Sequence, residues 1–369
     1  MFTNLTSHDS FIEQCRQLLP QVRLTQLRNL SLIVIGLLQS TDAHLSSLAE
    51  VIPLDITDLS IEQRVRRWLK NSRIDVQSWY EPFVLAGLQL YGGQEVYVVL
   101  DTSQFGPSCR ALLVGLAYGG QVMPLGWRVV KGKKGHTDPH LQNELLSQIE
   151  KYLPPGRITL LADSEFSSVD LLNPIQEQRW LFIVRVRGNI SVQLDDDTSF
   201  MLNQAGLKKG QTKWWQPIWW TALHRFGPLM LVATWQKGED KPLYVLTNTD
   251  NSQAALLVYT WRFWIEALFA DFKGRGFHLA HTKIRDPQRL SRLLLAASIA
   301  FLWALAVGSF VFHSPQQRLV DRNDRVDRSF FQLGYRFIKR CFKLNRIPDI
   351  FFSLNPHWFP LNLTPLTVR

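Results

Sequence analysis

Two aspartates follow short apolar runs that have the composition of buried strands. The run VYVVL at 96–100 leads into Asp101, and the run ITLLA at 158–162 leads into Asp163. Open sheets place their ligand sites at the carboxyl ends of parallel strands, so two such strands side by side would bring both carboxylates together. Neighbouring carboxylates repel each other unless a cation lies between them, and Mg²⁺ or Mn²⁺ prefers oxygen ligands. The pattern indicates a candidate metal site, although each aspartate could instead cap the turn after its strand.

A helical segment further along the chain carries residues that suit the surroundings of such a site. The segment YTWRFWIEALFADFK contains Tyr259, Arg262, Glu266 and Lys273. At about 100° per residue in an α-helix, these four side chains fall within one stripe about 60° wide. A carboxylate between cations suits a phosphodiester substrate, because a metal needs an anionic ligand while phosphates need Arg, Lys and hydroxyl donors. The alternative is an ordinary surface pair of Arg262 with Glu266.

The same segment also has an apolar stripe that can pack against a sheet. Its members are Trp261, Ile265, Leu268 and Phe272. The segment is therefore expected to be a helix that buries one face and presents the four polar side chains beside the two aspartates.

Motifs for several other enzyme classes are absent from the sequence. It has no HExxH, no GxSxG, no phosphate-binding loop of the GxxxxGK[ST] type and no GxGxxG after a strand. These absences argue against a zinc protease, a serine hydrolase, an NTPase and a dinucleotide-dependent enzyme. The three cysteines form no CxxC pair, which excludes a disulfide scaffold and a thiolate zinc site.

The charge of the chain favours a polyanionic partner. The 369 residues include 41 Lys and Arg against 31 Asp and Glu, a net charge of +10. Such an excess suits nucleic acid or an anionic membrane surface and does not choose between them. The uncharged run 293–312 is long enough to span a bilayer. We expect it to be a buried core helix, and a membrane-associated protein is the third and least favoured functional class.

The first part of the chain reads as helical, with a layout similar to a helix-turn-helix. We predict helices over 24–38, from Asp42 to Val51, and from Asp58 or Ser60 into the basic stretch that ends near 71. The basic helix carries the candidate DNA-binding residues Arg64, Arg66 and Arg67. The alternative is a solvated basic face on an ordinary helical bundle.

The remaining elements predict an α/β fold, in which a mixed sheet is flanked by helices. We expect strands at 96–100, 111–118, 122–130, 158–162 and 180–186, and helices at 139–152 and 167–178. Gly119-Gly120 predicts a hairpin turn. Residues 187–248 look like a separate β-rich piece whose crowded tryptophans either pack across strands or stack bases. Residues 313–369 are basic at first and then rich in Pro and Phe, and we expect a basic tail.

At these residues the sequence resembles a known family. The segment 259–273 has the form Y-(2)-R-(3)-E-(6)-K and is similar to DDE transposases of bacterial insertion sequences, in the subgroup with a Tyr-Arg-Glu-Lys signature. Asp101 in VVLDTSQ resembles the family's first catalytic Asp, and Asp163 in LLADSEFSS resembles the second. FIVRVRGN resembles the strand that follows. The resemblance extends from about 60 to 345, with Ser164 where the family often has Arg.

The resemblance implies a fold, a reaction and roles for these residues. The core would be ribonuclease-H-like, formed by 91–186 and 249–312, with 187–248 as the insertion and 1–90 as a helical DNA-binding domain. Its catalytic carboxylates would be Asp101, Asp163 and Glu266, which would bind Mg²⁺ or Mn²⁺, as two ions, for phosphoryl transfer. The residues expected to hold DNA phosphates are Tyr259, Arg262 and Lys273.

It also implies partners and a site for an unstacked base. Tyr244 is the first candidate to stack a flipped base of a hairpinned end, and Trp235 is the second. The partners would be double-stranded DNA, both element ends and target, bound by a homodimer without a membrane, in the bacterial cytoplasm at the nucleoid. The alternative is an inactive or repurposed DNA-binding protein of the same fold.

Overall fold

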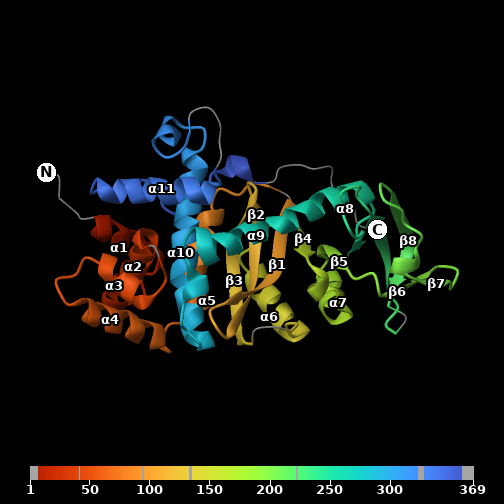
Figure 1. The fold of residues 1–369 in the computed structure, drawn as a ribbon, viewed down its shortest axis with the longest axis horizontal. Helices are drawn as coiled ribbons and strands as arrows, with labels where there is room; N and C mark the ends of the chain where they lie inside the picture. The colour runs from red at the N-terminus through yellow and green to blue at the C-terminus, as the bar shows by residue number, and fades with distance from the viewer. Residues whose placement is uncertain are drawn as a thin grey trace.

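The computed structural model describes residues 7–40, 42–93, 95–132, 135–221, 223–322 and 328–359. The strands form one hydrogen-bonded mixed sheet in the order β3-β2-β1-β4-β5-β10-β9-β8-β6-β7. The strands are β1 (Glu95–Phe105), β2 (Cys109–Tyr118), β3 (Gln121–Lys131), β4 (Arg157–Ala162), β5 (Leu181–Val186), β6 (Ser191–Leu194), β7 (Ser199–Met201), β8 (Thr212–Trp220), β9 (Phe226–Thr234) and β10 (Leu243–Thr247). A mixed sheet with helices on its faces agrees with the predicted α/β class and is compatible with a ribonuclease-H-like domain (Figure 1).

Strands β1 and β4 are parallel neighbours, as the aspartate pattern requires. Their ladder ends at the pair Leu100 and Ala162, so Asp101 and Asp163 follow at equivalent positions. The expectation that the first strand stops at Asp101 is wrong, because β1 stays paired with the antiparallel β2 as far as Phe105. Asp101 therefore lies inside a strand, whereas Asp163 begins the turn after its strand.

The hairpin between β2 and β3 confirms the predicted turn. Gly119 and Gly120 both have positive φ, of 52° and 81°, a conformation that glycine adopts without steric cost. Every residue of β2 is buried. The hairpin thus supports β1 from one side while β4 supports it from the other.

The N-terminal part is helical, as expected, but the residues that cap two of its helices are not the predicted ones. The helices are α1 (Ser7–Leu18), α2 (Leu24–Gln39), α3 (Leu45–Val51), α4 (Asp58–Lys70) and α5 (Val76–Leu88). Asp42 does not cap α3, which begins after His44. Thr57 caps α4, rather than Asp58 or Ser60, because its side chain accepts the hydrogen bond from the Ser60 amide.

The segment with the Tyr-Arg-Glu-Lys spacing is helical but is not one regular α-helix. After α8 (Ser252–Tyr259) the chain tightens into the 3₁₀ turn η3 (Thr260–Phe263), continues as α9 (Trp264–Ala270) and widens into the π-turn η4 (Asp271–Arg275). Most of the predicted apolar stripe is fully buried, and Trp261 packs edge-on against Tyr97 of β1 at 4.8 Å between ring centroids. The predicted face therefore packs on the sheet.

The β-rich insertion is not a separate piece, which corrects the expectation for 187–248. β10 pairs antiparallel with β5, and β9, β8, β6 and β7 continue the same sheet outward. The open edge of β5 offers unpaired backbone groups, and pairing with β10 satisfies them. The core sheet and the insertion are thus one hydrogen-bonded surface.

Helix α10 (Pro287–Val311) is the centre of the molecule. It could cross a membrane by length and apolar composition alone, but almost all of it is buried in the protein. It contacts α2, α4, α5, β3 and α11, and Figure 1 shows it between the N-terminal helices and the sheet. This agrees with the expected core helix.

The described residues after α10, 312–322 and 328–359, include helical elements and buried side chains, so they do not form the basic tail expected from 313. Helix α11 (Phe330–Lys343) packs across α10, and residues up to Phe359 lie against the core. The remaining helices are α6 (Pro139–Glu150) and α7 (Val169–Glu177). The last predicted residues, 360–369, lie outside the described part of the chain.

Candidate active site

Asp101 and Asp163 meet at the same guanidinium, that of Arg262. Its Nη2 lies 2.8 Å from Oδ2 of Asp101 and 3.6 Å from Oδ2 of Asp163. Parallel pairing of β1 with β4 places the two aspartates side by side, and η3 carries Arg262 over the edge where β4 ends. The structure thus brings the two predicted catalytic aspartates together with Arg262, the predicted phosphate contact from a distant segment.

Glu266 completes the group from the next helical turn. Its Oε1 accepts a 2.7 Å hydrogen bond from Nη1 of Arg262, the predicted (i, i+4) pair. One buried guanidinium therefore contacts all three predicted carboxylates, which a simple surface pair does not explain. The side chain of Arg262 is 8% exposed and that of Glu266 is 58% exposed, so the group opens to solvent on the glutamate side.

Burial and the mutual charges control the ionisation of the group. Burial raises the pKa of Asp101 to about 6, although Arg262 and the Thr102 amide act in the opposite direction. Burial lowers the pKa of Arg262, but Asp101, Asp163 and its other anionic neighbours outweigh this effect and raise it overall. The guanidinium therefore stays charged and serves as the counter-ion of the carboxylates.

The carboxylates have the chemistry of a metal site, with Arg262 between them. Among the described residues, no three Asp, Glu, His or Cys side chains stand close enough to hold a metal ion. The three carboxylates nevertheless converge on one cationic group, and hard oxygen donors of this kind suit Mg²⁺ or Mn²⁺. The chemistry of the donors thus suits a divalent cation, and Arg262 occupies the space between them in this structure.

Lys273 and Tyr259 both lie near the group, since Asp101 influences the pKa of each. The Nζ atom of Lys273 donates a 2.6 Å hydrogen bond to Oγ of Ser103, two residues beyond Asp101 on β1. Burial lowers the pKa of Lys273 overall, although the charge of Asp101 acts in the opposite direction. The Tyr259 hydroxyl and Nε of Arg262 are buried without a hydrogen-bond partner among the described residues, so both are unsatisfied donors that a ligand could reach only after the surrounding side chains move.

Two further polar residues at this edge were not among the predicted site residues. Oε1 of Glu165 accepts hydrogen bonds from the amide and the hydroxyl of Thr137, both at 2.8 Å, and thereby fixes the chain before α6. Nη1 of Arg185 on β5 lies 3.9 Å from Oδ1 of Asp163. Arg185 is the one exposed position in an otherwise buried strand, and that break in the pattern was the available signal.

The predicted DNA-binding arginines of α4 lie away from this group. Arg64 donates to Asn29 at 2.6 Å, and Arg66 pairs with Glu62 on its own helix. Arg67 is exposed. None of the three contacts the carboxylates, so any DNA that they hold would extend beyond the candidate active site.

The predicted base-stacking residue Tyr244 lies in the sheet. Its side chain on β10 is 6% exposed. Gly188 packs against the Tyr244 ring, since a Cβ added at Gly188 would lie 3.1 Å from the nearest ring carbon. Stacking on this ring would require the chain around Gly188 to move. The second candidate, Trp235, is half-buried, and its indole N–H donates to the carbonyl of Glu239.

The comparison with protein families gives one match. Residues 108–303, more than half of the chain, match the family described as the transposase DDE domain. Asp163 and Glu266 lie inside the matched residues, and Asp101 lies shortly before them. No curated protein matches the chain.

Proposed function

Because this chain belongs to the transposase DDE domain family, we propose that it is a DNA transposase that binds the ends of its insertion sequence, cleaves the DNA and joins the 3′ ends to target DNA. The observation that carries the proposal is the contact of Asp101, Asp163 and Glu266 with one buried guanidinium. The spacing of Tyr259, Arg262, Glu266 and Lys273 supports membership of the Tyr-Arg-Glu-Lys subgroup of bacterial insertion sequences.

The roles of the residues follow from their placement. Asp101, Asp163 and Glu266 would bind two divalent cations. When bound, these cations would neutralise charge and activate a water or a 3′-hydroxyl. Lys273 and the unpartnered Tyr259 hydroxyl would hold phosphate oxygens beside them. Arg185 would supply a second guanidinium next to Asp163, where Ser164 provides no charge.

The same proposal covers partners and compartment. The partner is double-stranded DNA at both element ends and at the target, and pairing of two ends calls for a homodimer on DNA. The protein would act at the nucleoid in the bacterial cytoplasm. The alternative, an inactive DNA-binding protein, is less well supported because all three carboxylates are present and gathered at one point.

The Glu266→Gln substitution tests the catalytic assignment. Linear DNA that carries the flanks of the gene is incubated with wild type or variant in Mg²⁺ or Mn²⁺, and new ends are mapped. We expect discrete breaks with wild type and at least about a thousandfold less cleavage with Glu266→Gln, because an amide is a poor ligand for a hard cation. Glu266 is 58% exposed, so the fold and the binding of ends should persist.

The control is Glu144→Gln, which changes an exposed glutamate on α6 whose ion pair among the described residues is with His140. It should cleave like wild type. A Glu266→Gln protein that still cuts would remove Glu266 from the catalytic set. Wild-type protein that binds the ends without any metal-dependent cleavage would favour the inactive DNA-binding alternative.

A further inference from the structure

Helix α11 has one buried apolar face and one basic face. Phe331, Leu333 and Ile338 are buried against the core. Four cations lie on the remaining surface at helical spacing: Arg336, Lys339, Arg340 and Lys343. No carboxylate of the described residues pairs with Arg336 or Arg340, so packing of the helix does not use their charge.

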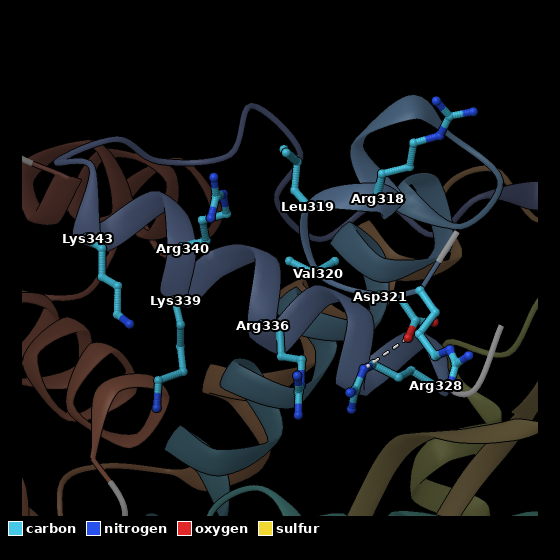
Figure 2. A pocket seen from close by; sticks show the side chains of 10 residues that line it. Arg318, Leu319, Val320, Asp321, Arg328, Arg336, Lys339, Arg340 and Lys343 are labelled. Atoms are coloured by element: carbon cyan, nitrogen blue, oxygen red, sulfur yellow. Dashed lines mark ion pairs between the residues drawn. The ribbon is translucent and has the colours of Figure 1, made fainter. Parts of the chain in front are cut away.

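A second wall faces this helix and makes a basic groove of about 460 Å³. Arg318 and Arg328 come from the chain between α10 and α11, as Figure 2 shows. Seven of the ten lining residues are Lys or Arg, and one is acidic. That one, Asp321, has a side chain only 1% exposed, and its Oδ1 lies 3.2 Å from Nε of Arg328. The acidic residue is thus paired, and Arg336 and Arg340 add positive charge that no carboxylate of the described residues opposes.

The charge density along α11 is of the same order as that of a DNA duplex. The four cations of α11 lie along about 10 Å of helix axis at 1.5 Å per residue. Duplex DNA carries about six phosphate charges over the same length. An anionic membrane would be a weaker fit, because surface helices bind bilayers by inserting an apolar face, and the apolar face of α11 is buried.

The groove is joined rigidly to the candidate active site. Phe331 of α11 packs against Phe277 with ring centroids 5.5 Å apart, and Phe277 follows the π-turn that carries Lys273. Phe331 also stacks on Phe301 of α10 at 4.7 Å. On its other side, α11 contacts α2 through a 3.4 Å hydrogen bond from Lys339 to the carbonyl of Gln39. DNA held in the groove would keep a fixed relation to the carboxylates.

We propose that the groove between α11 and the wall formed by residues 318–322 and Arg328 binds the phosphate backbone of duplex DNA without reading its sequence. The groove lies outside the residues that match the transposase DDE domain, so the family match does not assign it. The inference rests on the proposed function, because it takes DNA as the substrate. Its cations would contact the duplex beyond the segment that enters the active site.

The test compares two variants that each lose two positive charges. Arg336→Gln/Arg340→Gln removes charge from the groove, and Arg16→Gln/Lys151→Gln removes it from exposed positions on α1 and at the end of α6. Binding to two duplexes, one with the element ends and one unrelated, is measured over a range of salt concentrations. The groove variant should bind both about tenfold more weakly, with the slope of log K against log salt reduced by about two.

Each outcome has a distinct meaning. Equal binding by the groove and control variants, with steep salt dependence in wild type, would overturn the groove and leave the proposed function standing. Loss with the element ends alone would overturn backbone binding in favour of sequence reading. Salt-insensitive or absent DNA binding by wild type would instead remove the proposed function. If the groove variant loses binding to anionic vesicles and keeps its affinity for DNA, the groove is a membrane site.

Discussion

At the scale of single residues, Arg262 supplies the positive charge that balances three neighbouring carboxylates. Its two terminal nitrogens contact Asp101, Asp163 and Glu266 at 2.7–3.6 Å. The sequence predicts a phosphate contact for this residue. Both descriptions agree if the guanidinium leaves the carboxylates when a metal and DNA arrive. In the protein without DNA, Arg262 would then compete with the metal for the same oxygens.

The Arg262→Gln substitution should therefore raise the affinity of the DNA-free protein for Mn²⁺ about tenfold. Two unit charges about 4 Å apart interact by about 4 kcal/mol at an effective dielectric constant of 20, and tenfold requires about 1.4 kcal/mol. Free Mn²⁺ is counted by electron paramagnetic resonance. Arg187→Gln is the control for loss of an arginine, because this exposed arginine contacts His136 and, among the described residues, no carboxylate. Unchanged or weaker binding with Arg262→Gln would show that the arginine supports the metal site.

Asp271 gives a second prediction at this scale. Its side chain is 1% exposed, and burial raises its pKa to about 7 despite the nearby Arg275. The unfolded value is about 3.9, so the folded state holds a proton that the unfolded state releases. The free energy of unfolding should fall as pH rises from about 4 to about 7. Asp271→Asn should flatten this decline in urea unfolding, whereas Asp240→Asn, on the exposed surface, should not.

At the scale of elements, the sequence predicts most helices and strands because their apolar periodicity is local. The two short runs before Asp101 and Asp163 predict strands, and the structure shows that these strands are parallel neighbours, although β1 continues beyond Asp101. The irregular turns η3 and η4 break an assumed regular helix. The contact of Glu165 with Thr137 depends on packing between distant segments, which no local pattern encodes. Joining of β10 to β5 is likewise a long-range pairing.

The crossing of α10 and α11 depends on two glycines. A Cβ on Gly334 would lie 1.8 Å from the carbonyl oxygen of Ala304, and one on Gly308 would lie 1.7 Å from that of Phe330. Gly334→Ala should lower the free energy of unfolding by about 3 kcal/mol or more, because the helices must separate. Urea unfolding measures this. Gly238→Ala, with nothing within 4 Å, should change it by less than about 1 kcal/mol.

At the scale of the whole molecule, the N-terminal helices and the catalytic sheet share one hydrophobic core. Helix α10 contacts both, and buried residues from α2 through α11 form a single cluster. Nη1 of Arg292 on α10 donates a 3.0 Å hydrogen bond to the carbonyl of Leu69 on α4. The basic helix α4 is therefore held in relation to the candidate active site through α10.

Because of this shared core, the protein would measure a fixed length of DNA. If α4 holds the element end, the number of base pairs between the recognised sequence and the cut phosphate is set by the rigid distance between α4 and the carboxylates. Insertion of roughly five base pairs between them turns the duplex by about half a turn. Cleavage should then be lost or fall at a displaced bond, while gel-shift affinity for the end is kept. Cutting at the original phosphate after the insertion would show that α4 moves independently of the core.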